Sequence, residues 1–209
     1  ACAMGSFYQN KHLGTFGDMG CISFNGNKII TTSGGGAILT HDLKLAMKAL
    51  HLSTQAKSSP NYNHDAIGYN YRMTGLSAAL GLGQLESLNQ FLDRKKKINT
   101  RYKQALENIE GVEIPKNNER SDPNCWLFAA IVPNVYFLAG SLPKHNIEGR
   151  TLWMPLQTLE MFSTSIFITD TNVVSQVFQN ALSLPSSTTL TNQEQEYIID
   201  TIAGYLTVK

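Results

Sequence analysis

Residues 17–28 read GDMGCISFNGNK, and this stretch decides how the chain is interpreted. The apolar run from Met19 to Phe24 predicts a short buried strand. Asn25 and Gly26 then end the strand in a turn, because both residue types favour turn conformations. Lys28 follows in that turn, ahead of a run of glycines at 34–36. The sequence therefore predicts that a single primary amine lies at the end of a buried strand.

Spacing alone leaves more than one interpretation of Lys28. It can be a solvated surface charge before a glycine-rich hairpin, since most lysines are exposed. It can also be a nucleophile, because a primary amine forms a Schiff base with a carbonyl compound, and the Ser23 hydroxyl would suit a phosphate oxygen. A nucleotide-binding P-loop is excluded, because Gly20 and Gly26 are too far apart and Ile29 replaces the required Ser or Thr.

Composition excludes several classes of protein. Hydrophobic residues make up 42% of the chain, and 17 basic residues face 16 acidic ones. Such a chain can bury a core, and it has no net field that would attract nucleic acid or an anionic membrane. The 3 cysteines and 5 histidines lack the spacing of a metal site. Because the cysteines are odd in number and widely spaced, we expect a protein of the reducing cytoplasm, and no apolar run reaches the length of a membrane span.

Two domains are expected, over residues 1–90 and 91–209. The first continues with a strand at 37–40 and a helix at about 42–50. Apolar residues then recur at intervals of three and four over about 75–109, which predicts a long helix joining the domains. The charged run 93–97 on this helix is interpreted as a solvated face rather than a phosphate-binding patch.

The second domain is expected to hold strands and short helices. Strands are predicted at 112–114 and 126–132, and only a short helix fits between Pro133 and Pro143. Helices at about 172–182 and 192–206 would pack on this sheet. The second of them starts with a capping box formed by Thr191 and Glu194.

Several motifs together resemble one family. Residues 14–36, with SFNGNKIITT and the three glycines, resemble the lysine motif of the DegT/StrS nucleotide-sugar aminotransferases. Residues 64–73, HDAIGYNYRM, resemble its LegC-like branch in particular. The landmarks NCWL at 124–127, RTLW at 150–153 and LPSS at 184–187 follow in the family's order. The resemblance covers nearly the whole chain.

This resemblance implies an α/β fold of the aspartate aminotransferase-like fold-type I class. The chain would be the C-terminal half: the end of the large domain that binds pyridoxal 5'-phosphate, and a small α+β domain. The acidic partner of the pyridinium nitrogen and the main phosphate-binding segment would lie upstream of Ala1. Cys2 falls where relatives carry Gln, His or Glu beside the ring.

The resemblance also implies roles for five residues. Lys28 would be the catalytic residue and would bind the cofactor covalently, and Ser23 would bind its phosphate. Asn70 would reach the phosphate of the neighbouring subunit in a homodimer with shared sites. Arg72 and Arg150 would bind substrate anions. The alternatives are a strand-end hydroxyl for Ser23, a turn residue for Asn70, and structural ion pairs for the arginines.

The implied activity is transfer of an amino group, from glutamate, to C4 of a nucleotide-linked 4-keto-6-deoxy-N-acetylhexosamine for surface-glycan synthesis. A related branch carries histidine in place of the lysine and removes a hydroxyl, so Lys28 favours amino transfer. The alternative is a noncatalytic dimerising or regulatory remnant of such an enzyme. No metal is implied.

Overall fold

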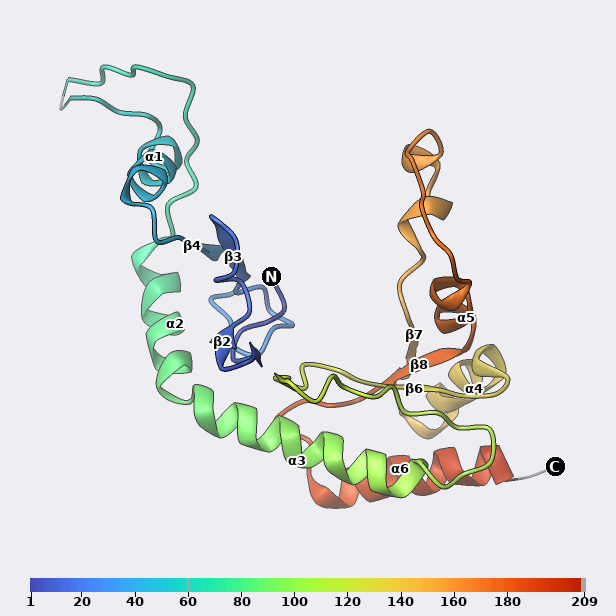
Figure 1. The fold of residues 1–209 in the computed structure, drawn as a ribbon. Coiled ribbons are helices and arrows are strands. Elements are labelled where there is room, and N and C mark those ends of the chain that lie inside the picture. The colour runs from blue at the N-terminus through green and yellow to red at the C-terminus, as the bar shows by residue number, and fades with distance from the viewer. Residues whose placement is uncertain (60, 208–209) are drawn as a thin grey trace. The chain divides into compact units, whose positions relative to one another are not determined.

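The computed structural model describes residues 1–59 and 61–207 (Figure 1). Contacts within the chain divide it into two compact units. The first contains Ala1–Asp93 and Asn117–Trp126, and the second contains Arg94–Lys116 and the chain from Leu127 onward. The segment 117–126 therefore returns to the first unit after the chain has entered the second.

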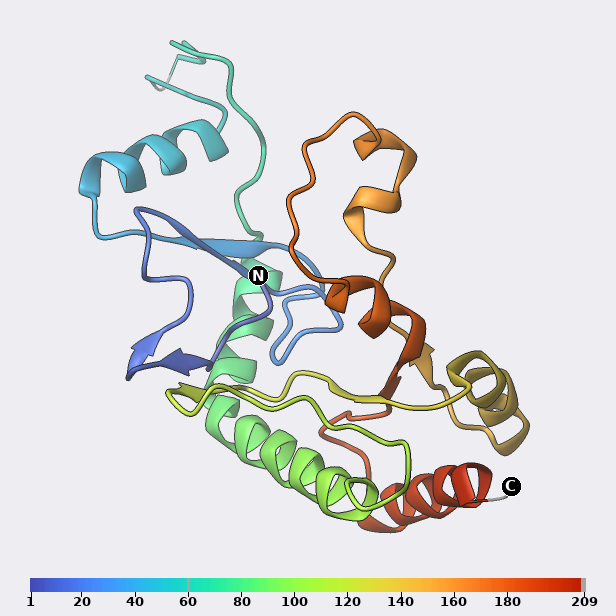
Figure 2. The ribbon, with the colours of Figure 1, turned by 45° about the vertical axis from the view of Figure 1, so that its right-hand side comes forward.

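Two small antiparallel sheets form part of the first unit. Strand β1 (Phe7–Tyr8) pairs with both β2 (Lys11–His12) and β5 (Ser121–Asp122). Strand β3 (Gly20–Ser23) pairs with β4 (Gly36–Leu39), from which the chain continues into the first helix (Figure 2). Both predicted strands are thus confirmed: the strand predicted at 19–24 is shorter by one residue at each end, and the strand predicted at 37–40 begins and ends one residue earlier.

The predicted burial of β3 is correct for one face only. Ile22 is buried, whereas Cys21 is exposed, as expected when successive side chains point to opposite faces. Gly20 is required on the buried face, because a Cβ there would lie 1.7 Å from the carbonyl oxygen of Gly14. The strand that leads to Lys28 is therefore held closely against the preceding loop.

The helices of the first unit follow local capping rules. Helix α1 (Leu43–Ser53) begins after Asp42, whose carboxylate accepts hydrogen bonds from the backbone N–H groups of residues 44 and 45.

One helix is predicted over 75–109, but the structure has two, α2 (Gly75–Glu86) and α3 (Leu88–Leu106). They are separated at Ser87, whose ψ of 2° departs from helical geometry.

The second unit contains an antiparallel sheet in which β8 (Ala181–Leu184) lies between β6 (Phe128–Ile131) and β7 (Arg150–Thr151). The other elements are α4 (Val135–Ser141), η1 (Leu142–His145), η2 (Leu156–Thr158), η3 (Glu160–Phe162), α5 (Val173–Asn180) and α6 (Asn192–Thr207). The short helix predicted between the two prolines is α4, which confirms that expectation.

Two elements of this unit differ from the prediction. The helix expected over 172–182 ends at Asn180, and the next residues form β8, the central strand of the sheet. The strand expected at 112–114 is reduced to an isolated bridge between Glu113 and Ile131. In both places strand pairing, which depends on distant residues, decides the local conformation.

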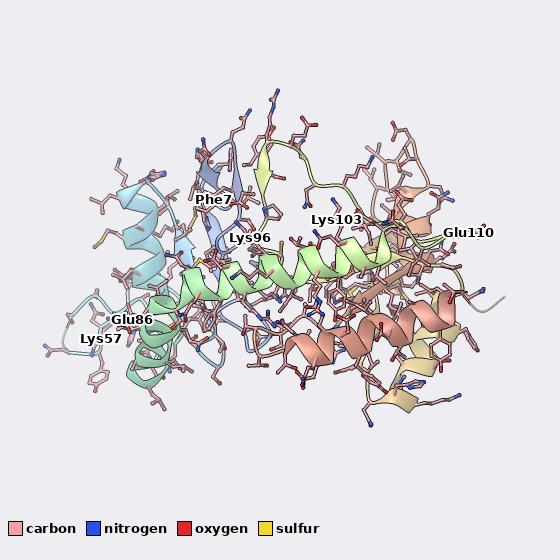
Figure 3. All side chains as sticks on the ribbon, turned by 90° about the horizontal axis from the view of Figure 1, so that it is seen from below. Phe7, Lys57, Glu86, Lys96, Lys103 and Glu110 are labelled. Carbon is pink, nitrogen blue, oxygen red and sulfur yellow. The ribbon has the colours of Figure 1, made fainter. Side chains whose placement is uncertain are left out.

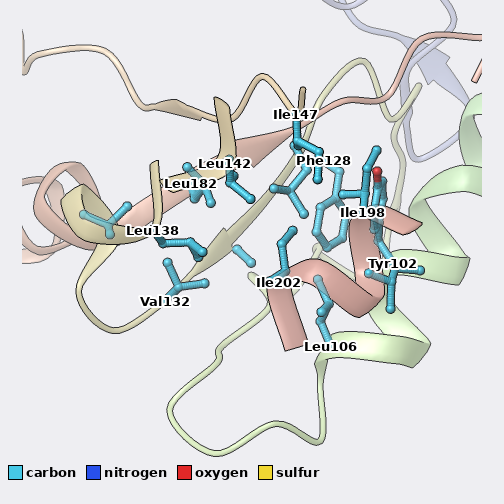
Figure 4. Packing of buried hydrophobic residues seen from close by; sticks show 14 of the residues in the cluster. Tyr102, Leu106, Phe128, Val132, Leu138, Leu142, Ile147, Leu182, Ile198 and Ile202 are labelled. Carbon is cyan, nitrogen blue, oxygen red and sulfur yellow. The ribbon is translucent and has the colours of Figure 1, made fainter. Parts of the chain in front are cut away.

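The core of the second unit joins α3, the sheet and α6 (Figure 4). Tyr102 stacks on Phe128 with ring centroids 4.9 Å apart, and Ile98 and Ile202 are buried beside them. The Tyr102 hydroxyl donates a hydrogen bond to the carbonyl oxygen of Pro185 over 2.8 Å. Burial raises the pKa of this hydroxyl, because it disfavours the charged phenolate.

The charged run on α3 is not a uniformly solvated face. Asp93 and Lys97 are exposed, but Lys95 is buried and its Nζ donates to the carbonyl oxygen of Ser186 over 2.5 Å. The prediction was therefore wrong for Lys95. Arg94 and Arg101 donate to Asn192 at the start of α6, so α6 lies beside the second part of α3 (Figure 3).

The predicted capping box is present at the start of α6. Glu194 accepts from the Thr191 backbone N–H over 2.7 Å, and the Thr191 hydroxyl accepts from the Glu194 N–H over 3.2 Å. The hydrogen bonds from Thr191 lower the pKa of the Glu194 carboxyl, because they stabilise its charged form. Among the described residues, no helix is long and apolar enough to cross a membrane.

We expect Ile202→Ala to lower the free energy of unfolding by about 2–4 kcal/mol, because it leaves a cavity in the core. Ile202 is 1% exposed, whereas Ile166 of the same unit is 90% exposed. The matched change Ile166→Ala should therefore cost less than about 0.5 kcal/mol. Urea unfolding of both variants measures the difference, and equal losses would contradict the core assignment.

Candidate functional site

The turn that carries Lys28 is fixed by backbone hydrogen bonds and by two buried neighbours. The Lys28 N–H donates to the carbonyl oxygen of Asn25 over 3.0 Å. Ile29 and Ile30, which follow directly, are both buried. Because burial of the isoleucines anchors the chain on one side of the turn, the lysine side chain lies partly buried at its edge.

The amine of Lys28 lies between a thiol and an aromatic ring. Its Nζ donates to Cys2 Sγ over 3.1 Å and lies 3.9 Å from the centroid of the Trp126 ring. The ring face attracts the ammonium group, since its quadrupole is negative there. The Trp126 indole N–H donates in turn to the carbonyl oxygen of Asn27 over 2.6 Å, so the ring is tied to the same turn.

The buried side chain of Asn124 organises this arrangement. Its Nδ2 donates to the carbonyl oxygens of Cys2 and Met4 over 2.8 and 2.9 Å, and its Oδ1 accepts from the Trp126 N–H over 3.0 Å. Its backbone N–H donates to the Ser6 hydroxyl over 2.9 Å. One amide thus holds the segments that supply both neighbours of the Lys28 amine.

Ser23 is the last residue of β3, before the turn that carries Lys28. Its hydroxyl oxygen accepts a hydrogen bond from the Asn25 N–H over 3.3 Å, which is the strand-end role weighed as the alternative. A hydroxyl that accepts one hydrogen bond can still donate its own hydrogen to a phosphate oxygen. The structural role and the predicted binding role are therefore compatible.

Asn70 lies in an isolated antiparallel bridge with Thr54, and its side chain is exposed. Tyr69 and Tyr71 on either side of it stack with ring centroids 4.9 Å apart. Since neighbouring side chains of an extended segment point to opposite faces, Asn70 points away from this stacked pair. Arg72 is exposed shortly after it in the same unit.

Arg150 belongs to the second unit, as the first residue of β7. It is exposed, and its Nε donates to Glu148 Oε1 over 2.9 Å. This is the structural ion pair that was weighed against substrate binding. An exposed ion pair of this kind contributes little to stability. The role of Arg150 in substrate binding therefore stays a prediction.

The sequence prediction missed two features of the site. Residues 124 and 126 belong to a motif that carried the resemblance, but no role followed from it. The available signal was a polar Asn shortly before an apolar strand, because a buried amide must find hydrogen-bonding partners. The described residues contain no group of His, Cys, Asp and Glu side chains that could hold a metal ion.

The site suits attack by an amine on a carbonyl group. The partners of the Lys28 Nζ are a thiol and a ring face, and neither forms an ion pair with it. A carbonyl carbon at this edge of the turn would lie beside the positioned amine of Lys28. The Ser23 hydroxyl lies at the end of β3, the strand before this turn. These residues fit a phosphorylated aldehyde such as pyridoxal 5'-phosphate.

Comparison with known proteins identifies the family and the fold class of this chain. The chain belongs to the DegT/DnrJ/EryC1/StrS aminotransferase family, whose sequence profile matches residues 1–203. Its fold corresponds to part of a family member from Brucella abortus, with a TM-score of 0.90 and 26% identity over 100% of this chain and 56% of that one. The predicted fold-type I α/β class and the predicted family are confirmed.

Two curated relatives extend the comparison. EpsN of Bacillus subtilis (strain 168), named as a candidate pyridoxal phosphate-dependent aminotransferase, is 38% identical over 96% of this chain and 53% of its own length. GDP-perosamine synthase of Escherichia coli O157:H7 is 34% identical over 99% of this chain and 57% of its own length. The chain thus spans about half the length of these relatives.

We expect Asn124→Ala to lower the free energy of unfolding by about 1–3 kcal/mol, because buried hydrogen-bonding groups lose their partner. Asn117, an exposed residue of the same returning segment, provides a matched control, and Asn117→Ala should cost less than about 0.5 kcal/mol. Urea unfolding measures both changes. An Asn124→Ala protein as stable as the control would contradict the organising role of Asn124.

Proposed function

We propose that this chain is the C-terminal part of a pyridoxal phosphate-dependent aminotransferase that acts on a nucleotide-linked keto sugar. The observation that carries the proposal is the half-buried Lys28, whose Nζ is held beside Cys2 and the Trp126 ring in a member of this family. When bound, the cofactor would withdraw electrons from the carbon that carries the transferred amine.

In this proposal three residues of the first unit, Lys28, Ser23 and Asn70, have separate roles. Lys28 would bind the cofactor covalently through Nζ and, once released, would carry a proton from the substrate carbon that bears the amine to the aldehyde carbon of the cofactor. Ser23 donates its hydroxyl hydrogen to the cofactor's phosphate. Asn70 reaches the phosphate of a second copy of the chain, so we propose a homodimer with shared sites acting in the cytoplasm.

The substrate is proposed from the resemblance and from the relatives' names. The acceptor is a nucleotide-linked 4-keto-6-deoxy-N-acetylhexosamine of the LegC-like branch, aminated at C4 with glutamate as donor, for surface-glycan synthesis. GDP-perosamine synthase, by its name, also makes a nucleotide-linked sugar. Arg72 and Arg150 would bind the carboxylate of the donor or the diphosphate of the sugar, as guanidinium groups do well.

We expect Lys28→Ala to lower the rate of amino transfer by about 10³-fold or more, because the nucleophile is removed. The assay uses the chain joined to the N-terminal half of EpsN, with the keto sugar nucleotide and with pyruvate as competing acceptors. Lys11→Arg provides a lysine control in the same unit, since Lys11 contacts the Phe16 ring and no thiol. Near-normal turnover by Lys28→Ala would refute the assignment.

The acceptor preference is a separate result of the same assay. Contacts with the nucleotide supply binding energy that positions C4, so the keto sugar should be preferred over pyruvate. Preference for pyruvate would refute the sugar, but not the role of Lys28. If the Lys11→Arg control protein shows no absorbance of bound pyridoxal phosphate, the result would instead support the noncatalytic alternative.

Mixed dimers test whether Asn70 acts in the neighbouring subunit. The inactive variants Lys28→Ala and Asn70→Ala should together recover about a quarter of normal activity, because random pairing gives half of the dimers one intact site. Differently tagged subunits allow the mixed dimers to be purified and counted. Confirmed mixed dimers without activity above either parent would show that Asn70 does not act across the interface.

A further inference from the structure

The contact between Cys2 and Lys28 brings an oxidisable sulfur against an amine. Cys2 is exposed, Lys28 is partly buried, and their Sγ and Nζ atoms are 3.1 Å apart. Peroxides oxidise an accessible thiol to a sulfenic acid, and the sulfur of a sulfenic acid is attacked by nitrogen as well as by thiols. The pair therefore holds both reactants of a sulfur–nitrogen coupling.

Both partners are held in place by other contacts. The carbonyl oxygen of Ala1 accepts from the Ser23 N–H over 3.2 Å, and that of Cys2 accepts from Asn124 Nδ2 over 2.8 Å. Lys28 is fixed by its own turn and by the Trp126 ring. Because the segments on both sides are tied down, the reaction between the two side chains gains the rate advantage of proximity.

We propose that Cys2 and Lys28 form a modification site at which a hydroperoxide, such as hydrogen peroxide, joins the two side chains through a sulfur–nitrogen bond. In the first step the Cys2 sulfur attacks the peroxide and the O–O bond breaks. The sulfur becomes a sulfenic acid, and the other oxygen leaves as water with the thiol proton. In the second step Lys28 Nζ attacks the sulfur and the S–O bond breaks, so a second water leaves with a proton from nitrogen.

The sum of the two steps consumes one peroxide and removes two electrons and two protons, which together are two hydrogen atoms, from the protein. A dithiol reverses the reaction, because its thiolate attacks the same sulfur and releases the amine. The bond would occupy the amine that a carbonyl compound needs. Only this consequence for cofactor binding rests on the proposed function, since the coupling itself requires no cofactor.

The test uses the purified chain without cofactor, in a Cys21→Ala, Cys125→Ala background that leaves Cys2 as the sole thiol. After treatment with hydrogen peroxide, the intact mass should fall by about 2 Da, the loss of two hydrogens. Trypsin should no longer cut after Lys28, and peptide 1–11 should appear joined to the peptide that spans Lys28. Dithiothreitol should restore the original mass and the cut.

Three further variants in this background assign the bond. Lys28→Arg and Cys2→Ser should abolish the loss of mass, whereas Lys11→Arg, which changes a lysine over the Phe16 ring, should retain it. Circular dichroism checks each fold, and if Lys28→Arg is misfolded, fragmentation of the joined peptides locates the bond instead. A product that keeps oxygen and is heavier by about 14–16 Da would overturn the proposal, as would a loss of mass that persists in folded Lys28→Arg.

A final measurement separates this proposal from the proposed function. Peroxide-treated protein should no longer be labelled at Lys28 by pyridoxal phosphate and borohydride, whereas the dithiothreitol-treated protein should be labelled again. If untreated protein is never labelled, the chain without an N-terminal half does not bind the cofactor, and the coupling is judged by its mass alone. If treated and untreated proteins are labelled equally, the coupling is overturned.

Discussion

The hydrogen bonds of Asn124 join parts of the first unit that are far apart in the sequence. Its side chain binds the segment before β1 and the backbone of Trp126, and Trp126 then contacts the turn that carries Lys28. A buried amide that satisfied fewer of these groups would leave costly unpaired donors and acceptors. The surroundings of the Lys28 amine therefore depend on a residue whose own hydrogen bonds go to Cys2, Met4, Ser6 and Trp126.

Local chemistry made a large part of the fold predictable. The turn after β3, the Asp42-capped helix α1 and the capping box of Thr191 and Glu194 all follow from residues close together in the sequence. The position of Lys28 in its turn was also predicted for this reason. Family membership followed from motifs in order rather than from physical reasoning, and the comparisons confirm it.

Features decided by distant partners were not predictable. The apolar residues of β8 continue the pattern of the helix before them, and pairing with β6 and β7 makes this segment a strand. Lys95 is buried because Ser186 accepts its hydrogen bond, which a charged run does not indicate. In the candidate site, the thiol and the ring beside Lys28 come from opposite ends of the first unit's sequence.

The separation between Asn124 and its partners also affects the order of folding. The hydrogen bond to the Met4 carbonyl closes a loop of 120 residues, and closing a loop of this length is entropically costly until other contacts bring its ends together. During synthesis the Lys28 turn leaves the ribosome well before Asn124 does. The amine therefore gains its final surroundings late, after the part of the second unit over Arg94–Lys116 has also been made.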